Sequence, residues 1–260
     1  MKIVLVVVLL MFACVVRAQE TELDDTLYNK VIQLDSVLVK APRMSFRKII
    51  VPATLVTAGI FSVGNGFIRH EDMRMRNELQ EHIHQKFTVD NFTQYAPAAA
   101  VFSLKALGVK SSHTWKEQAL VTGMSFLLMA ALVNGMKYTL REQRPDGTTR
   151  NSFPSGHTAT AFVGAEILYQ EYKDESPWIG YAGYAVATGT GFLRMYNNRH
   201  WLTDVVGGAG VGILSARLGY WLYPKIFSSR LSVGEKRGPL LAAAPYYDTR
   251  SVGFCMDLKF

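Results

Sequence analysis

Six long apolar segments between residues 49 and 223 constrain the fold of this chain more than any other feature. They are rich in Gly, Ala, Leu and Met, and Pro, Gly or charged residues separate them. Apolar runs of this length with such breaks are typical of helices, and no strand pattern precedes residue 240. The segments are 49–68, 92–108, 117–136, 157–170, 178–194 and 203–223. We therefore predict an all-α fold, built as a six-helix bundle.

The composition favours a bundle embedded in a membrane or associated with one. The hydrophobic content of 49% is high for a soluble protein, whereas 19% charged residues is too many for a chain made only of membrane spans. The net charge of +7 favours anionic partners, such as phosphate groups or anionic lipid. The sequence has no basic run with interleaved aromatic residues, which is the pattern that would indicate nucleic-acid binding. The sequence does not indicate an oligomeric state.

The two ends of the chain differ from the bundle. Lys2, an apolar run over 3–16 and the small-residue site ending at Ala18 predict a secretory signal peptide over 1–18. Residues 19–48 lack a long apolar period and are predicted to be a linker. The helical domain then covers 49–226. In the tail, 227–260, an alternating pattern with a turn near residues 248–250 predicts a small C-terminal β-hairpin.

A charged stretch, "RHEDMRMRNELQEHIHQKF", follows the first apolar segment and predicts an amphipathic helix. His82 and His84 are two residues apart, so on a helix they point in different directions and do not form a metal site. Thr114 and Glu117 fit a capping box at the start of the third helix. His113 is then only the residue before a cap.

Two rows of small residues mark the fifth and sixth predicted helices. Spacing of four residues lets two helix backbones approach closely. The rows are Gly183, Ala187 and Gly191, followed by Gly208, Gly212 and Ala216. We predict that these two helices pack against each other and fix the loop between them, 195–202.

Three polar clusters stand at helix ends: "KYTLREQRP", "PSGH" and "RMYNNRHWLTD". In the third, His200 and Asp204 are four residues apart and share one helix face. The carboxylate can accept a hydrogen bond from one imidazole nitrogen and leave the other free as a nucleophile or base. On its own, such a pair is more typical of a surface contact.

In the second cluster, Ser155 can cap the fourth helix and Gly156 lets its N–H approach a ligand closely. A helix N-terminus is a ready anion site, and His157 lies in its first turn. By itself this tetrapeptide fits an ordinary helix start equally well.

Three cations decide between these readings. Lys137, Arg144 and Arg194 all fall at helix ends, near this helix start and the two histidines. Cations gathered there repel one another unless a dianion lies among them. Phosphate is the occupant that we expect.

These residues together resemble a known family. Lys137 precedes Arg144-Pro145, then Pro154-Ser155-Gly156-His157, then Arg194, His200 and Asp204. This spacing is similar to the three-part signature of the type-2 phosphatidic acid phosphatases, which is shared with bacterial class A acid phosphatases and vanadium haloperoxidases. The match covers 137–204, and the helix pattern extends the likeness to about 49–223. Leu193 departs from it, since the family usually has Ser there, which removes a polar contact but no charge.

The resemblance implies a metal-independent phosphatase with no cofactor. His200 would attack phosphorus to give a phosphohistidine, and Asp204 would orient His200. His157 would protonate the leaving alkoxide and then activate water. The phosphate oxygens would be held by Lys137, Arg144, Ser155, Gly156 and Arg194. No Asp, Glu and His cluster in the sequence offers a metal a site.

The family's substrates suggest phosphate monoesters or diphosphates of an envelope lipid: lipid A, undecaprenyl diphosphate or phosphatidylglycerol phosphate. We expect the bacterial cell envelope, at the inner membrane or its periplasmic face. A soluble nonspecific periplasmic acid phosphatase, a haloperoxidase and a noncatalytic phosphate-binding membrane protein are the alternatives. Glu166 and Gln170 interrupt the fourth segment, so six spanning helices and a periplasmic bundle resting on a membrane both stay open.

Overall fold

The computed structural model describes residues 46–81, 86–234, 240–248 and 251–259. The predicted signal peptide, almost all of the predicted linker, and His82 and His84 lie outside these residues. The chain divides into two compact units, residues 1–223 and 224–260.

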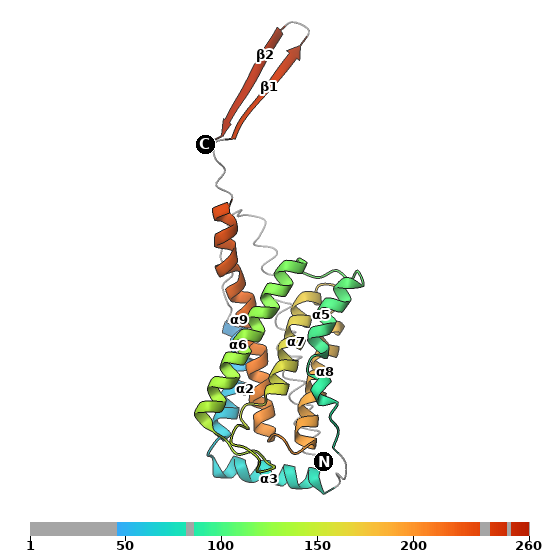
Figure 1. The fold of residues 1–260 in the computed structure, drawn as a ribbon, viewed down its shortest axis with the longest axis vertical. Coiled ribbons are helices and arrows are strands. Elements are labelled where there is room, and N and C mark those ends of the chain that lie inside the picture. Colours follow the sequence, from blue (N-terminus) through green and yellow to red (C-terminus); the bar gives the residue numbers. More distant parts are fainter. Residues whose placement is uncertain (1–45, 82–85, 235–239, 249–250, 260) are drawn as a thin grey trace. The chain divides into compact units, whose positions relative to one another are not determined.

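Eight helices occur in the described residues (Figure 1). They are α2 (Phe46–Ser62), α3 (Gly66–Gln80), α4 (Asp90–Thr93), α5 (Ala96–Ala106), α6 (Trp115–Leu140), α7 (Gly156–Tyr172), α8 (Pro177–Tyr196) and α9 (Leu202–Gly234). The all-α prediction for the first unit is confirmed, whereas the count of six helices is not. The second unit holds a two-stranded antiparallel hairpin of β1 (Leu240–Asp248) and β2 (Ser251–Lys259), as the alternating tail predicted.

The prediction of one helix over 49–68 is wrong. Gly64 has a φ of +81°, a conformation that suits glycine, and it follows the end of α2. Asn65 then caps α3 by accepting hydrogen bonds from the N–H groups of Phe67 and Ile68. The two helix axes are bent by 95°. Helix α3 therefore crosses one end of the bundle instead of prolonging α2 (Figure 1).

Helix α7 is the centre of the bundle. Nearly every residue from Thr158 to Tyr172 is buried, and α5, α6 and α8 all pack against it. The α5 contact is close at Gly164, where an added Cβ would lie 2.6 Å from the backbone nitrogen of Ala98. A helix that is apolar or small all round is expected in such a place.

The two rows of small residues mainly face this central helix, which corrects the predicted pairing of the fifth and sixth helices. A Cβ on Gly212 of α9 would lie 2.6 Å from the carbonyl oxygen of Ala159. A Cβ on Gly183 of α8 would lie 2.8 Å from Leu168. Gly191 meets α9 at Val205 and also lies against Thr158 of α7. Small residues thus bring α8 and α9 close to α7 from two sides.

Glu166 does not interrupt the bundle as its charge suggested. It lies in the middle of α7, fully buried, and pairs with Nε of Arg217 on α9 at 3.0 Å. The hydroxyl of Tyr184 on α8 donates a further hydrogen bond to it. A buried carboxylate with a cation and a hydroxyl donor joins three helices without leaving an unpaired charge.

Two of the described helices are long and apolar enough to cross a membrane: α6 and residues 202–227 of α9. The bent pair of α2 and α3 adds a third span if it is counted as one broken crossing. Helix α5 is apolar but short. These helices agree with the prediction of a membrane-embedded or membrane-associated bundle, and fewer than six of them meet the length and composition of a span.

Candidate active site

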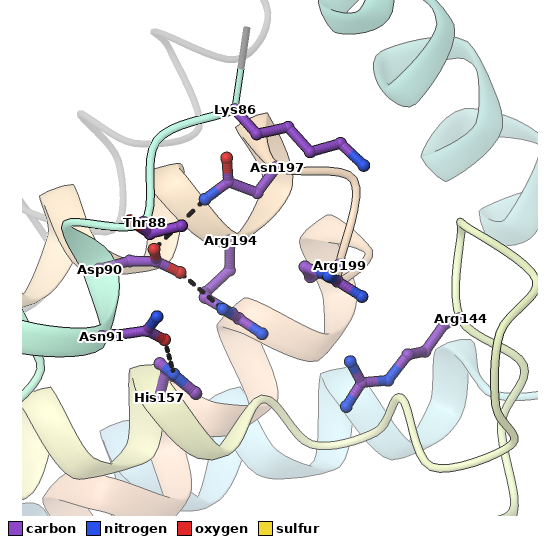
Figure 2. A pocket seen from close by; sticks show the side chains of 9 residues that line it. All are labelled: Lys86, Thr88, Asp90, Asn91, Arg144, His157, Arg194, Asn197 and Arg199. Atoms are coloured by element: carbon purple, nitrogen blue, oxygen red, sulfur yellow. Dashed lines mark hydrogen bonds and ion pairs between the residues drawn. The ribbon is translucent and has the colours of Figure 1, made fainter.

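The three predicted motifs meet at one end of the bundle. The backbone N–H of Ser155, before α7, donates to the carbonyl of Asp204 on α9 at 3.0 Å. Beside this junction lies a cavity of about 230 Å³. Figure 2 shows its lining side chains: Lys86, Thr88, Asp90, Asn91, Arg144, His157, Arg194, Asn197 and Arg199.

The structure brings His200 and Asp204 together as their spacing predicted. His200 lies just before α9, and its Nδ1 is 3.4 Å from Oδ2 of Asp204. The same oxygen accepts hydrogen bonds from the backbone N–H of Trp201, at 2.9 Å, and from the hydroxyl of Ser152. These donors fix the carboxylate, and the carboxylate orients the imidazole through Nδ1. The ring nitrogen that remains for chemistry is Nε2.

The surroundings of His200 keep its imidazole neutral. Burial lowers the pKa of His200 to about 4, and the positive charges of Lys137 and Arg194 act in the same direction. The hydrogen bond to Asp204 opposes this shift without overcoming it. A neutral imidazole with one nitrogen anchored has a lone pair free for attack.

The "PSGH" turn forms the start of α7, and its contacts correct one prediction. Ser155 occupies the N-cap position of α7, but its side chain makes no capping hydrogen bond, and its hydroxyl oxygen accepts from Thr158 at 2.9 Å. Gly156 is the first residue of the helix, and none of the hydrogen bonds among the described residues uses its N–H. That amide is available to an anion. His157 follows it and lines the cavity.

Two of the three predicted cations line the cavity. Arg144 reaches it from the loop after α6, where its Nε donates to Asn151 at 2.9 Å. Arg194 reaches it from the end of α8 and pairs with Asp90, while its buried Nε has no partner in the described part of the chain. Burial lowers the pKa of Arg144, and the positive charge of the nearby Arg194 adds to the shift.

Lys137 differs from this pair. It is not among the lining residues, and its Nζ donates to the carbonyls of Asn151 and Ser152. The ammonium group thereby ties the end of α6 to the loop that carries Ser152. It still lies near enough to His200 for its charge to affect the imidazole.

Helix α4 supplies site residues that the sequence did not indicate. Asp90 forms the ion pair with Arg194, and Asn91 Oδ1 lies 3.0 Å from Nε2 of His157. Both line the cavity (Figure 2). They stand more than 40 residues before the first motif, and no local pattern marks them. A polar Asp-Asn at a helix start reads as an ordinary cap.

Arg199 is a second addition. It lines the cavity and pairs with Asp146 at 3.0 Å, which joins the loop before α9 to the loop after α6. The sequence shows that Arg199 lies within the third motif, but it does not show that the side chain lines the cavity.

Helix α3 braces the loops of the site from outside. Arg69 pairs with the buried Glu142 and stacks over the ring of Trp201 at 4.5 Å. Asp72 accepts a hydrogen bond from Thr203 at 2.6 Å. One helix thus contacts both the loop after α6 and the residues around His200, a link that its charged sequence alone did not reveal.

Among the described residues, no group of three or more His, Cys, Asp or Glu side chains could hold a metal ion. The polar groups around the cavity are mainly cations and amides, which suit an anion.

Comparison with known proteins gives a consistent set of likenesses. Residues 118–228 match the PAP2 superfamily. The chain is 46% identical over 140 residues to the lipid A 1-phosphatase of Porphyromonas gingivalis, an alignment that covers 54% of this chain and 32% of that protein. It is 33% identical over 88 residues to the bacitracin transport permease protein BcrC of Bacillus licheniformis, covering 33% of this chain and 41% of that protein.

The chain therefore spans less than half the length of either curated relative. Among solved structures, it is similar to the transmembrane PAP2 type phosphatidylglycerolphosphate phosphatase from Bacillus subtilis. The TM-score is 0.49 at 21% identity, and the match covers 68% of this chain and 97% of that one.

Proposed function

We propose that this protein is a phosphatase acting on an envelope lipid, because residues 118–228, which carry all the motif residues, match the PAP2 superfamily. One observation carries the proposal. A neutral, oriented His200, the cavity-lining His157, and Arg144 with Arg194 converge at one end of the bundle. This set supplies a nucleophile, a proton donor and charge for phosphate oxygens, which is what phosphoryl transfer needs.

In the first step, Nε2 of His200 attacks phosphorus in line. The N–P bond forms as the P–O bond to the lipid breaks, and His157 gives a proton to the leaving alkoxide. Asp204 stabilises the positive charge that develops on the phosphohistidine ring. In the second step, water attacks phosphorus, His157 takes its proton, and the N–P bond breaks to release inorganic phosphate.

The phosphate oxygens would be held by a mixed set of charges and amides. Arg144 and Arg194 supply charge from the cavity wall, and Lys137 supplies it from behind the loop that carries Ser152. The Gly156 N–H and the Ser155 hydroxyl would complete the cradle at the start of α7. Donors fixed in this way stabilise charge on the transferring group without reorganising.

His157 needs a proton before it can act as the acid. In the free protein, burial lowers the pKa of His157 to about 4, and Arg194 adds to the shift. Two negative charges on a bound phosphate oppose both effects. Protonation of His157 is thereby coupled to substrate binding.

Lipid A phosphate is the first substrate that we propose, since the relative from P. gingivalis is named for it. An undecaprenyl diphosphate or phosphatidylglycerol phosphate is the next. The two helices long and apolar enough to cross a membrane, α6 and α9, would keep the lipid product in the membrane. The envelope location and an N-terminal signal peptide belong to this proposal.

Phosphate release from purified protein in detergent tests the proposal on these three lipids and on p-nitrophenyl phosphate. We expect turnover of at least one lipid, and loss of activity by at least about 10³-fold in His200→Ala with the thermal unfolding profile retained. Equal rates on the small ester without detergent would indicate a soluble acid phosphatase. Phosphate binding without turnover would indicate a noncatalytic protein.

A further inference from the structure

The two histidines of the site have partners of different charge. Asp204, a carboxylate within the matched segment, orients His200. Asn91, a neutral amide on α4, contacts His157, and it lies outside that segment. Figure 2 shows the Asn91 side chain directed at the His157 ring.

Helix α4 is held firmly enough for Asn91 to act as a fixed point. Asp90, the preceding residue, is buried and pairs with Arg194, and the side chain of Asn197 also donates to it at 3.3 Å. Thr93 shares a hydrogen bond with Thr190 of α8 at 2.9 Å. The short helix is therefore docked on α8 through its side chains on both sides of Asn91.

The contact uses one ring nitrogen of His157 and leaves the other. Asn91 Oδ1 is 3.0 Å from Nε2, and an amide oxygen only accepts, so Nε2 carries a proton. Nδ1 makes no hydrogen bond among the described residues. It is the nitrogen that can exchange a proton with a ligand in the cavity.

We propose that Asn91 is a positioning residue that holds His157 through Nε2 and presents Nδ1 to the leaving oxygen of the substrate. The inference rests on the proposed function and adds a residue that the family signature does not contain. Asn91 touches neither phosphorus nor the leaving group, and it acts through the histidine.

An amide suits this role better than a carboxylate does. His157 must give up a proton in one step and accept one in the next, so its two forms must stay close in free energy. The charged groups that face it are Asp90 from α4, Arg194 from α8 and Arg144 from the loop after α6, with His200 nearby. A carboxylate at position 91 would add a negative charge and favour the protonated ring.

The test compares Asn91→Ala and Asn91→Asp with wild type on phosphatidic acid, which has a poor alkoxide leaving group, and on p-nitrophenyl phosphate, which has a good one. In Asn91→Ala we expect kcat on phosphatidic acid to fall about 10- to 30-fold, with KM within about twofold. The loss on p-nitrophenyl phosphate should stay below about threefold, because that leaving group needs no acid. Asn134→Ala, on an exposed face of α6, is the matched control and should equal wild type.

Asn91→Asp keeps the shape of the side chain and changes its charge. We expect kcat on phosphatidic acid within about threefold of wild type, and an alkaline limb of the kcat profile displaced upward by about one pH unit. This readout holds even if Asn91→Ala proves too unstable to purify. A side chain at position 91 that did not contact the acid histidine would not move the pH profile.

Two results would overturn the inference: an equal loss on both substrates in Asn91→Ala, or an unchanged pH profile in Asn91→Asp. Failure of the proposed function looks different. In that case wild type would release no phosphate from any substrate, or His200→Ala would stay active. An active wild type, an inactive His200→Ala and an unaltered Asn91→Ala would reject the role of Asn91 alone.

Discussion

Two histidine–carboxylate pairs occur in the described part of the bundle, one at each end of α7: His200–Asp204 is buried, whereas in His113–Glu171 only the carboxylate is buried. His200 and Asp204 meet beside its N-terminus, and His113 and Glu171 meet at its C-terminal end, with 2.9 Å between Nδ1 and Oε1. The two ends of α7, Gly156 and Tyr172, are about 24 Å apart at the rise of an α-helix. His113 is thus more than the residue before a cap that the sequence suggested, although the predicted capping box of Thr114 and Glu117 is present.

The same kind of pairing accompanies opposite pKa shifts at the two ends. The hydrogen bond to Glu171 raises the pKa of His113, with Glu117 adding to it and burial and Lys105 opposing it. At the other end, burial and two cations lower the pKa of His200 to about 4. The pKa of His113 is thus shifted upward and that of His200 downward. Burial and the surrounding charges, and not the pairing itself, separate His113 from the proposed nucleophile, His200.

The largest expected contrast comes from neutralising each carboxylate in turn. Asp204→Asn should lower kcat by about 10³-fold, because the amide no longer fixes the His200 tautomer or stabilises its charge. Glu171→Gln should leave kcat within about twofold but cost about 3 kcal/mol of stability, because it breaks a buried pair. Initial rates on a lipid substrate and thermal unfolding in detergent measure the two effects. Similar losses of activity in both variants would contradict a catalytic role for one pair and a structural role for the other.

Acidification should act on the two ends with opposite sign. His200 has a pKa lowered from about 6.5, so between pH 6.5 and 4 the unfolded chain binds more protons than the folded one. Because the folded chain keeps His200 neutral, the free energy of unfolding falls by up to about 3 kcal/mol over this pH range. His113 has a raised pKa, so its contribution is fully present below about pH 6.5 and is lost as the pH rises through its folded value.

Thermal unfolding between pH 5 and 8 checks both signs. His200→Ala should lose less stability than wild type from pH 7 to pH 5, and His113→Ala should lose more. Parallel curves for the three proteins would contradict the assignment.

Glycine-to-alanine substitutions near the two ends of α7 should have a smaller effect on kcat than the carboxylate variants. A Cβ on Gly208 of α9 would lie 2.6 Å from the carbonyl oxygen of Ser155, and one on Gly180 of α8 would lie 2.5 Å from Tyr169. Both Gly208→Ala and Gly180→Ala should cost about 1–3 kcal/mol by overpacking. Only Gly208→Ala should also lower kcat, by about tenfold, because it displaces the start of α7 from Asp204. Denaturant unfolding and initial rates distinguish them, and an equal kcat in both would count against the close approach at Ser155.

Sequence patterns that span only a few residues were sufficient to predict much of the fold and part of the site. The apolar runs located the long helices, since helix formation depends on local hydrogen bonds and side-chain spacing. The spacing of His200 and Asp204 placed them on one face, and the capping box followed from Thr114 and Glu117. The break at Gly64 was missed because the apolar run continues across it.

Only the tertiary structure decided which helix lies at the centre and which distant residues complete the site. The rows of small residues could have packed α8 against α9, and the packing of both on α7 depends on the shape of all three helices. Asp90 and Asn91 enter the site because α4 docks on α8, a contact between residues about 100 positions apart. Likewise, His113 and Glu171 are 58 positions apart, so only the folded chain pairs them. The pKa values of the two histidines diverge because burial and neighbouring charges are properties of the folded chain.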